Sequence, residues 1–222
     1  NGNTLQFNFI EKILATSLAK LANLIPEAGI WMNTQRPEWN DANNALVGNG
    51  VSMVTLSYLR RFLDFFKKLI VKLDSDKAYA VSEELAGMFA AMHKTFNKFF
   101  ALTQSSFNDE QRKQVLDELG EAASLFRTSV YQKGFSGKKT EISVKDLIDF
   151  INTSLVYLEQ SIEANKREDN LYHAYNLMTI TKNEVSIDYL DEMLEGQVAV
   201  LSSGYLNAQQ SLALLDALKK SA

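Results

Sequence analysis

The chain contains no cysteine among its 222 residues, so disulfide bonds and metal sites built on thiolates are excluded. Its formal net charge is −4. A sequence without an excess of basic residues offers no broad positive field, and nucleic acid is not an expected partner. No apolar run approaches the roughly 18 residues that a membrane-spanning helix needs, so we expect neither a transmembrane segment nor a membrane partner.

Proline is almost as scarce, and its placement is informative. The two prolines, Pro26 and Pro37, fall in one short stretch. Because proline interrupts helix interiors, the remainder of the chain is free to be helical. Apolar residues recur there at helical spacing, and alternation of Val, Ile and Thr is rare, so no strand is predicted. The predicted helices cover 4–25, 51–73, 77–105, 108–134, 143–165, 186–202 and the residues after 207.

Three of these helices begin at residues suited to N-capping. Asn108 is followed three residues later by Gln111, which is the pattern of a capping box. Ser143 and Asn207 are placed to cap the helices that follow them. These caps support an all-α protein made of antiparallel helical hairpins.

The segment 26–50 differs from the rest of the chain. It holds both tryptophans, both prolines, three glycines and many Asn and Asp residues, so we interpret it as irregular backbone. Flat aromatic rings beside carboxylates, amides and arginine suit a sugar, since an indole covers the apolar face of a pyranose while polar groups bind its hydroxyls. The alternative is a structural loop, because Asn and Asp are common in turns.

A short motif within this segment carries a resemblance. Glu38-Trp39-Asn40-Asp41 is similar to the Asp-Trp-Asn-Asp motif of cellobiose-phosphorylase-like and glycogen-debranching-like enzymes. In that group the first carboxylate is the general acid, on a loop at the mouth of an (α/α)6 toroid. The resemblance implies that Glu38 is the acid and that Asp41 belongs to the catalytic set. The substrate-binding residues would be Trp31, Arg36, Trp39, Asn40 and Asn43, with an oligosaccharide or glycoside as the partner.

The resemblance also implies a fold. The chain would be a single helical domain, 1–222, forming a partial or complete α/α toroid. It opens on Asn1-Gly2-Asn3 without an initiator methionine. We therefore expect a fragment of a larger toroid, against which the rest of the parent chain packs.

Two further groups are candidates for the same site. Tyr172, His173, Tyr175 and Asn176 combine aromatic rings with polar groups that suit a sugar, although a packed helix would also explain them. Glu192 and Glu195 share a helix face and would supply a second carboxylate, although such residues are more often solvated. No cofactor is implied, and no metal site is expected, because His93 has no ligand partner at helical spacing.

Three hypotheses remain open. The protein is an enzyme that cleaves glycosidic bonds by hydrolysis or phosphorolysis, a non-catalytic carbohydrate-binding domain, or a helical scaffold or interaction module. The first requires a second carboxylate opposite Glu38, at about 5–5.5 Å for retention or about 6.5–9.5 Å for inversion. The second requires exposed tryptophans, and the third predicts that Trp31 and Trp39 are buried.

Overall fold

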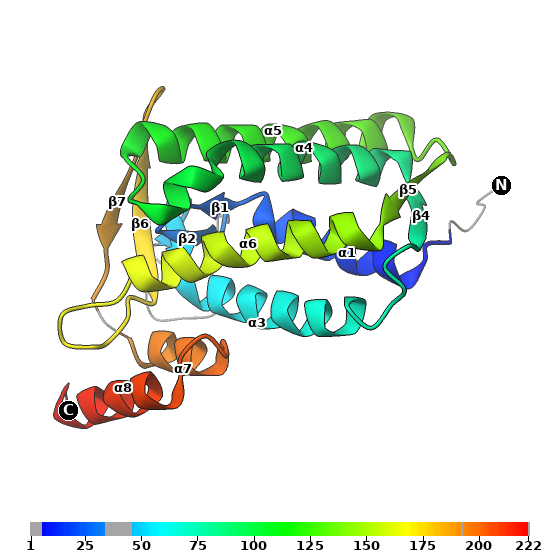
Figure 1. The fold of residues 1–222 in the computed structure, drawn as a ribbon. Helices are drawn as coiled ribbons and strands as arrows, with labels where there is room; N and C mark the ends of the chain where they lie inside the picture. The colour runs from blue at the N-terminus through cyan, green and yellow to red at the C-terminus, as the bar shows by residue number, and fades with distance from the viewer. Residues whose placement is uncertain (1–5, 34–45, 192, 222) are drawn as a thin grey trace.

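The computed structural model describes residues 6–33, 46–191 and 193–221. Helices dominate this part of the chain (Figure 1). They are α1 (Phe9–Leu21), α3 (Met53–Ile70), α4 (Glu83–Phe99), the short 3-10 helix η1 (Phe100–Gln104), α5 (Asp109–Lys133), α6 (Val144–Ala164), α7 (Leu194–Ser202) and α8 (Ala208–Ser221).

Strands form two antiparallel sheets in the same part of the chain. They are β1 (Leu24–Ile25), β2 (Gly29–Trp31), β3 (Gly50–Ser52), β4 (Ala78–Ser82), β5 (Lys139–Ser143), β6 (Tyr175–Ile180) and β7 (Val185–Tyr189). The larger sheet has the order β1-β2-β3-β6-β7, and the smaller one pairs β4 with β5. Strand β3 pairs with β6, with Val51 opposite Asn176, so the larger sheet joins distant parts of the sequence.

The long helices run alongside one another, with a sheet at each end of the bundle (Figure 1). Helices α4 and α5 lie together on one side, α3 lies on the other, and α1 and α6 lie between them. The five-stranded sheet is at one end and the β4–β5 ribbon is at the other, near the N-terminus. Helices α7 and α8 lie beside the end of α3 that is nearer the larger sheet.

A large apolar core holds the bundle together. It includes Leu18 from α1, Leu63 from α3, Phe96 from α4, Leu119 from α5 and Leu158 from α6, all nearly inaccessible to solvent. Burying a side chain of this size stabilises the folded state by about 1.5–3 kcal/mol. The five helices thus share one core, and a sheet lies at each end of them.

The expected all-α fold and α/α toroid are wrong, because the protein is a mixed helix-and-sheet structure. The segment 171–180, for which no strand was expected, contains β6, and the helix expected over 186–202 begins only at Leu194. Val185, Ile187 and Tyr189 alternate along β7, and Lys182 and Asn183 form the turn that joins it to β6. A period-two pattern in a five-residue strand was too short to outweigh the helical pattern after it.

The capping predictions are confirmed. Asn108 and Gln111 form a reciprocal capping box at the start of α5. Ser143 accepts a hydrogen bond from the backbone N–H of Asp146, and Asn207 accepts one from that of Gln210. Each cap satisfies a backbone N–H that would otherwise lack a partner in the first helical turn. The helix starts that carried a capping signal were therefore placed correctly.

Candidate functional site

An open groove of about 770 Å³ lies between α1 and α5. Ala15 and Ala19 form part of its α1 wall, and Gly120 and Ser124 form part of its α5 wall. Trp31, Met32 and Asn33, at the end of β2, lie on the same groove. Ligand sites in proteins usually enclose roughly 300–1,000 Å³, so the groove has the size of a small-molecule site.

Small residues on the facing helices keep the groove open. Ala15 and Ala19 of α1 and Ala22, the C-cap of that helix, recur at helical spacing, so none of these positions projects a long side chain into the space. Opposite them, a Cβ atom added at Gly120 would meet no atom within 4 Å. Glycine in a helix interior is unfavourable by roughly 0.5–1 kcal/mol relative to alanine. Gly120 therefore keeps a space that a larger residue would fill.

The groove combines apolar and polar walls. Trp31 and Phe126 contribute aromatic surface. Asp117 and Glu121, one helical turn apart on α5, contribute exposed carboxylates. Asp117 pairs with Lys113 at 2.5 Å. The groove thus offers an aromatic surface together with several hydrogen-bonding groups, which is a combination that suits a polyhydroxylated ligand.

Backbone and side-chain hydrogen bonds fix the position of Trp31. Its backbone N–H donates to the carbonyl of Asn23 at 2.8 Å, and its indole Nε1–H donates to the carbonyl of Gly48 at 2.8 Å. The β2–β3 pairing places Val51 opposite it. The indole is half-buried, so one part packs on the protein while the remainder is accessible from the groove.

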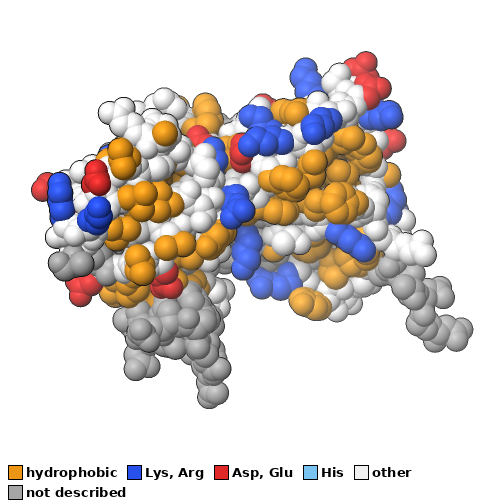
Figure 2. All heavy atoms as spheres, turned by 90° about the horizontal axis from the view of Figure 1, so that it is seen from below, with side chains coloured by type: hydrophobic (Ala, Val, Ile, Leu, Met, Phe, Trp, Pro, Cys, Tyr) orange, Lys and Arg blue, Asp and Glu red, His pale blue; other side chains and the backbone are white. Residues whose placement is uncertain are grey.

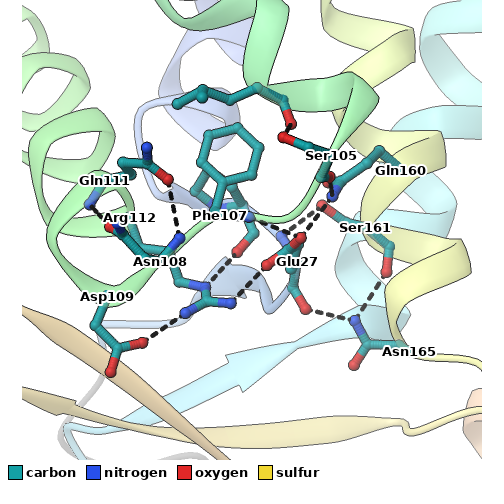
Figure 3. A network of polar contacts seen from close by, with 12 residues as sticks. Glu27, Ser105, Phe107, Asn108, Asp109, Gln111, Arg112, Gln160, Ser161 and Asn165 are labelled. Carbon is teal, nitrogen blue, oxygen red and sulfur yellow. Dashed lines mark hydrogen bonds and ion pairs between the residues drawn. The ribbon is translucent and has the colours of Figure 1, made fainter.

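The turn that leads into β2 is held by a buried polar network around Glu27 (Figure 3). Its carboxylate accepts hydrogen bonds from the backbone N–H of Phe107 at 3.0 Å, from Nε2 of Gln160 at 2.8 Å and from Nη2 of Arg112 at 2.5 Å. Its own backbone N–H donates to Ser161, and its carbonyl accepts from Asn165. One residue thus connects the β1–β2 turn to α5, to α6 and to the segment before α5.

Glu27 acts as a structural residue in this arrangement. Its φ angle of +64° lies in the left-handed region that non-glycine residues rarely occupy. The strain is offset by the three hydrogen bonds to its carboxylate, which leave that group committed to the protein. The network fixes the β1–β2 turn and, through it, the strand that ends at Trp31.

Several residues predicted for the sugar site lie outside the described residues. These are Arg36, Glu38, Trp39, Asn40, Asp41, Asn43 and Glu192. The first described range ends at Asn33, which lines the groove, and Glu38 is five residues further along the sequence. The catalytic assignment of Glu38 and Asp41 stays a prediction.

The second predicted patch is part of the protein interior. Tyr172, Tyr175 and Asn176 are each at most 2% exposed. Asn176 donates to the carbonyl of Ala28 and to Oδ1 of Asn165, both at 2.7 Å. Burial, with the charge of Glu163 adding to it, raises the pKa of Tyr172 to about 12.

His173 completes this patch and is also engaged within the protein. Its ring stacks on Tyr189 at 4.3 Å. The structure does not bring any of these four residues to the groove that Trp31 lines.

Sequence reasoning missed the carboxylates that the groove does contain. Asp117 and Glu121 lie on α5, whereas Glu195 lies on α7, on the opposite side of the bundle (Figure 1). One signal was present in the sequence, because Gly120, Ala123 and Ser124 give the middle of a long helix an unusually small face. A helix face made of small side chains indicates either close packing against another helix or an open groove. In α5 these small residues line the groove.

Within the described ranges no cluster of three or more His, Asp or Glu side chains is arranged to hold a metal ion. Over the same ranges, every helix is too short or too polar to span a bilayer. No protein-family model matches the sequence, and it has no significant match among curated proteins. The chemistry of the groove is therefore what points to a function.

Proposed function

We propose that the chain binds a carbohydrate in the groove between α1 and α5. The observation that supports this proposal is the combination of the anchored indole of Trp31, at the end of β2, with the carboxylates of Asp117 and Glu121 on α5. An indole packs against the apolar face of a sugar ring, and ionised carboxylates accept hydrogen bonds from its hydroxyls.

The groove also suits an oligosaccharide in its shape. It is open to solvent along the two helices, so a chain of sugar rings can enter from the side and extend beyond it. Its α1 wall consists of alanines, which leave room for a ring close to the backbone. Arg127 and Tyr131, further along α5, extend the polar lining.

Isothermal titration calorimetry with cello-, malto-, xylo- and laminari-hexaose tests the proposal. We expect at least one of these sugars to bind. Gly120→Leu should abolish this binding, because its side chain enters the open space of the groove. Trp31→Phe should weaken it by up to about tenfold, since an aromatic contact contributes roughly 0.5–1.5 kcal/mol.

Gly120→Ala is the matched control, because it keeps the groove nearly open and favours the helix. A circular-dichroism melt of each variant establishes that it is folded. The proposal is wrong if none of the four sugars binds at millimolar concentration. It is also wrong if a folded Gly120→Leu variant binds them as well as the wild type does.

A second candidate function is cleavage of the glycosidic bond, favoured by the sequence motif Glu38-Trp39-Asn40-Asp41. Glycosidic cleavage uses a pair of carboxyl groups, one of which protonates the leaving oxygen. Glu38 is the candidate acid by resemblance, and Glu121 and Asp117 are the carboxylates that line the described groove. Glu121 is the stronger candidate for the second role, because Asp117 already pairs with Lys113.

Release of reducing ends from the bound hexaose measures cleavage. Glu38→Gln should lower turnover by roughly 10²–10⁴-fold while leaving affinity unchanged, because it removes the proton and keeps the shape. Glu121→Gln should also lower turnover, and Glu195→Gln is the control on the far side of the bundle. Binding without measurable turnover in the wild type would leave the carbohydrate-binding proposal intact and refute the catalytic one.

A further inference from the structure

Helix α3 carries a second apolar stripe on its outer side. Tyr58, Phe62, Phe65 and Leu69 are exposed by 45%, 37%, 57% and 38%. Their spacing of four, three and four residues is that of a coiled-coil seam, which places all four along one line of the helix. The core side of α3 adjoins this stripe and is formed by Leu59, Leu63, Phe66 and Ile70, all buried in the core.

The stripe borders two hollows between α1 and α3. One, of about 370 Å³, is lined by Thr16 and Lys20 of α1 and by Tyr58 and Phe62 of α3. The other, of about 360 Å³, lies near the opposite ends of these helices, between Phe9 and Leu69. Figure 2 looks onto this side of the molecule and shows apolar side chains gathered there. The surface is a crevice between two helices, and a third helix fits such a shape better than a flat bilayer does.

The charges around the stripe have the opposite sign to the net charge of the protein. Arg61 and Lys68 each precede a stripe residue and occupy the flanking positions that face a partner helix in a coiled coil. Lys20 borders the crevice from α1, and Figure 2 shows Lys and Arg side chains around the apolar surface. The chain as a whole carries −4.

Asp64, the acidic residue on this part of α3, does not cancel the positive charge of Arg61 and Lys68. Asp64 pairs with Lys68 at 2.7 Å, four residues apart on the exposed helix. Pairs of this kind contribute only about 0.3–0.5 kcal/mol and are readily exchanged for another partner. The crevice therefore presents an apolar seam whose flanks are basic.

We propose that the α1–α3 crevice binds an acidic amphipathic helix of a partner protein. Its apolar residues, at the same alternating spacing of three and four, pack between Tyr58, Phe62, Phe65 and Leu69. Its flanking Glu or Asp residues face Arg61 and Lys68. Apolar packing supplies the affinity, and the charge pattern selects acidic helices over basic ones.

A pair of designed peptides tests this proposal. Each has four heptads with Leu at the two seam positions, and the flanking positions are all Glu in one peptide and all Lys in the other. Binding of labelled peptide to the full chain is measured by fluorescence anisotropy. We expect the Glu peptide to bind at least about tenfold more tightly than the Lys peptide, and Phe62→Ser/Phe65→Ser to abolish binding.

Charge reversal at the flanks provides a sharper result. Arg61→Glu/Lys68→Glu should weaken binding of the Glu peptide and strengthen that of the Lys peptide, which a misfolded variant would not do. Leu125→Ser is the matched control, because Leu125 is 65% exposed but lies on α5.

Four outcomes overturn the proposal. The first is that neither peptide binds, and the second is equal affinity for the two peptides. The third is binding to phosphatidylserine vesicles without peptide binding, which would identify a membrane as the occupant. The fourth is concentration-dependent dimerisation that Phe62→Ser/Phe65→Ser removes, again without peptide binding, which would identify a second copy of the chain.

Discussion

Replacing Glu27 tests how the β1–β2 turn is held. In Glu27→Ala the carboxylate that Arg112 contacts is removed, and the guanidinium keeps only its contacts with Asp109 and with the carbonyl of Pro26. The backbone N–H of Phe107 and the amide of Gln160 also lose their acceptor. All of these groups lie in or near the interior, where water replaces the lost partners poorly.

The expected loss of stability is large for a single substitution. The side chains of Arg112 and Glu27 are only 15% and 9% exposed, and removing one partner of such a buried pair costs about 3–5 kcal/mol. Glu27→Gly loses the same contacts but relieves the strain at φ +64°, which is worth roughly 1–2 kcal/mol. Glycine should therefore be the less damaging replacement, although it removes more atoms.

Urea denaturation followed by circular dichroism measures these differences. For a chain of this length, each kcal/mol also shifts the melting temperature by roughly 2–4 °C, which gives an independent check. Asp64→Ala is the control, since it breaks an exposed pair and should cost less than about 1 kcal/mol. A loss below that value for Glu27→Ala, or a glycine variant less stable than the alanine variant, would refute this account.

Three further predictions concern other parts of the protein. Burial favours a higher pKa for Glu11, but hydrogen bonds from Ser82 and Lys139 outweigh it and hold the pKa below its usual value of 4.5. In urea denaturation, Glu11→Gln should therefore show its full loss of stability above pH 4.5, and the loss should shrink as the pH falls further. A difference in stability that does not change with pH would contradict this. Gly196→Ala should lower the melting temperature, because the added Cβ would lie 2.7 Å from that of Ala174. Gly120→Ala should instead raise the free energy of unfolding by up to about 1 kcal/mol in a denaturant titration. A lower free energy of unfolding would mean that the added methyl group meets neighbouring atoms.

The sequence predicted the helices well where periodicity and caps agreed. The start of α5 at Asn108 and that of α6 at Ser143 were correct because a cap is a local interaction. The strands β1, β2 and β3 have two or three residues each and are too short for any repeating pattern to appear. Of the three, β3 also pairs with β6, which lies more than a hundred residues later in the sequence and cannot be found from a local pattern.

The same limit applies to the faces of α3 and to the candidate site. Tyr58, Phe62 and Leu69 were assigned to the buried stripe, but the helix is apolar on two sides, and its core side is centred on Leu63. The groove itself arises where the small residues of α1 and α5 face each other, which is a property of packing rather than of either segment alone. Among the predicted binding residues that the structure describes, Trp31 is the one that lies on the groove.

The pairing of β3 with β6 also has a consequence for synthesis on the ribosome. Gly50 pairs with Leu177, which emerges roughly 125 positions later. Because translation proceeds at about 5–20 residues per second, β6 is synthesised roughly 6–25 s after β3. During that interval β3 lacks the strand that borders it in the folded protein, and an unpaired strand edge can pair with other extended chains.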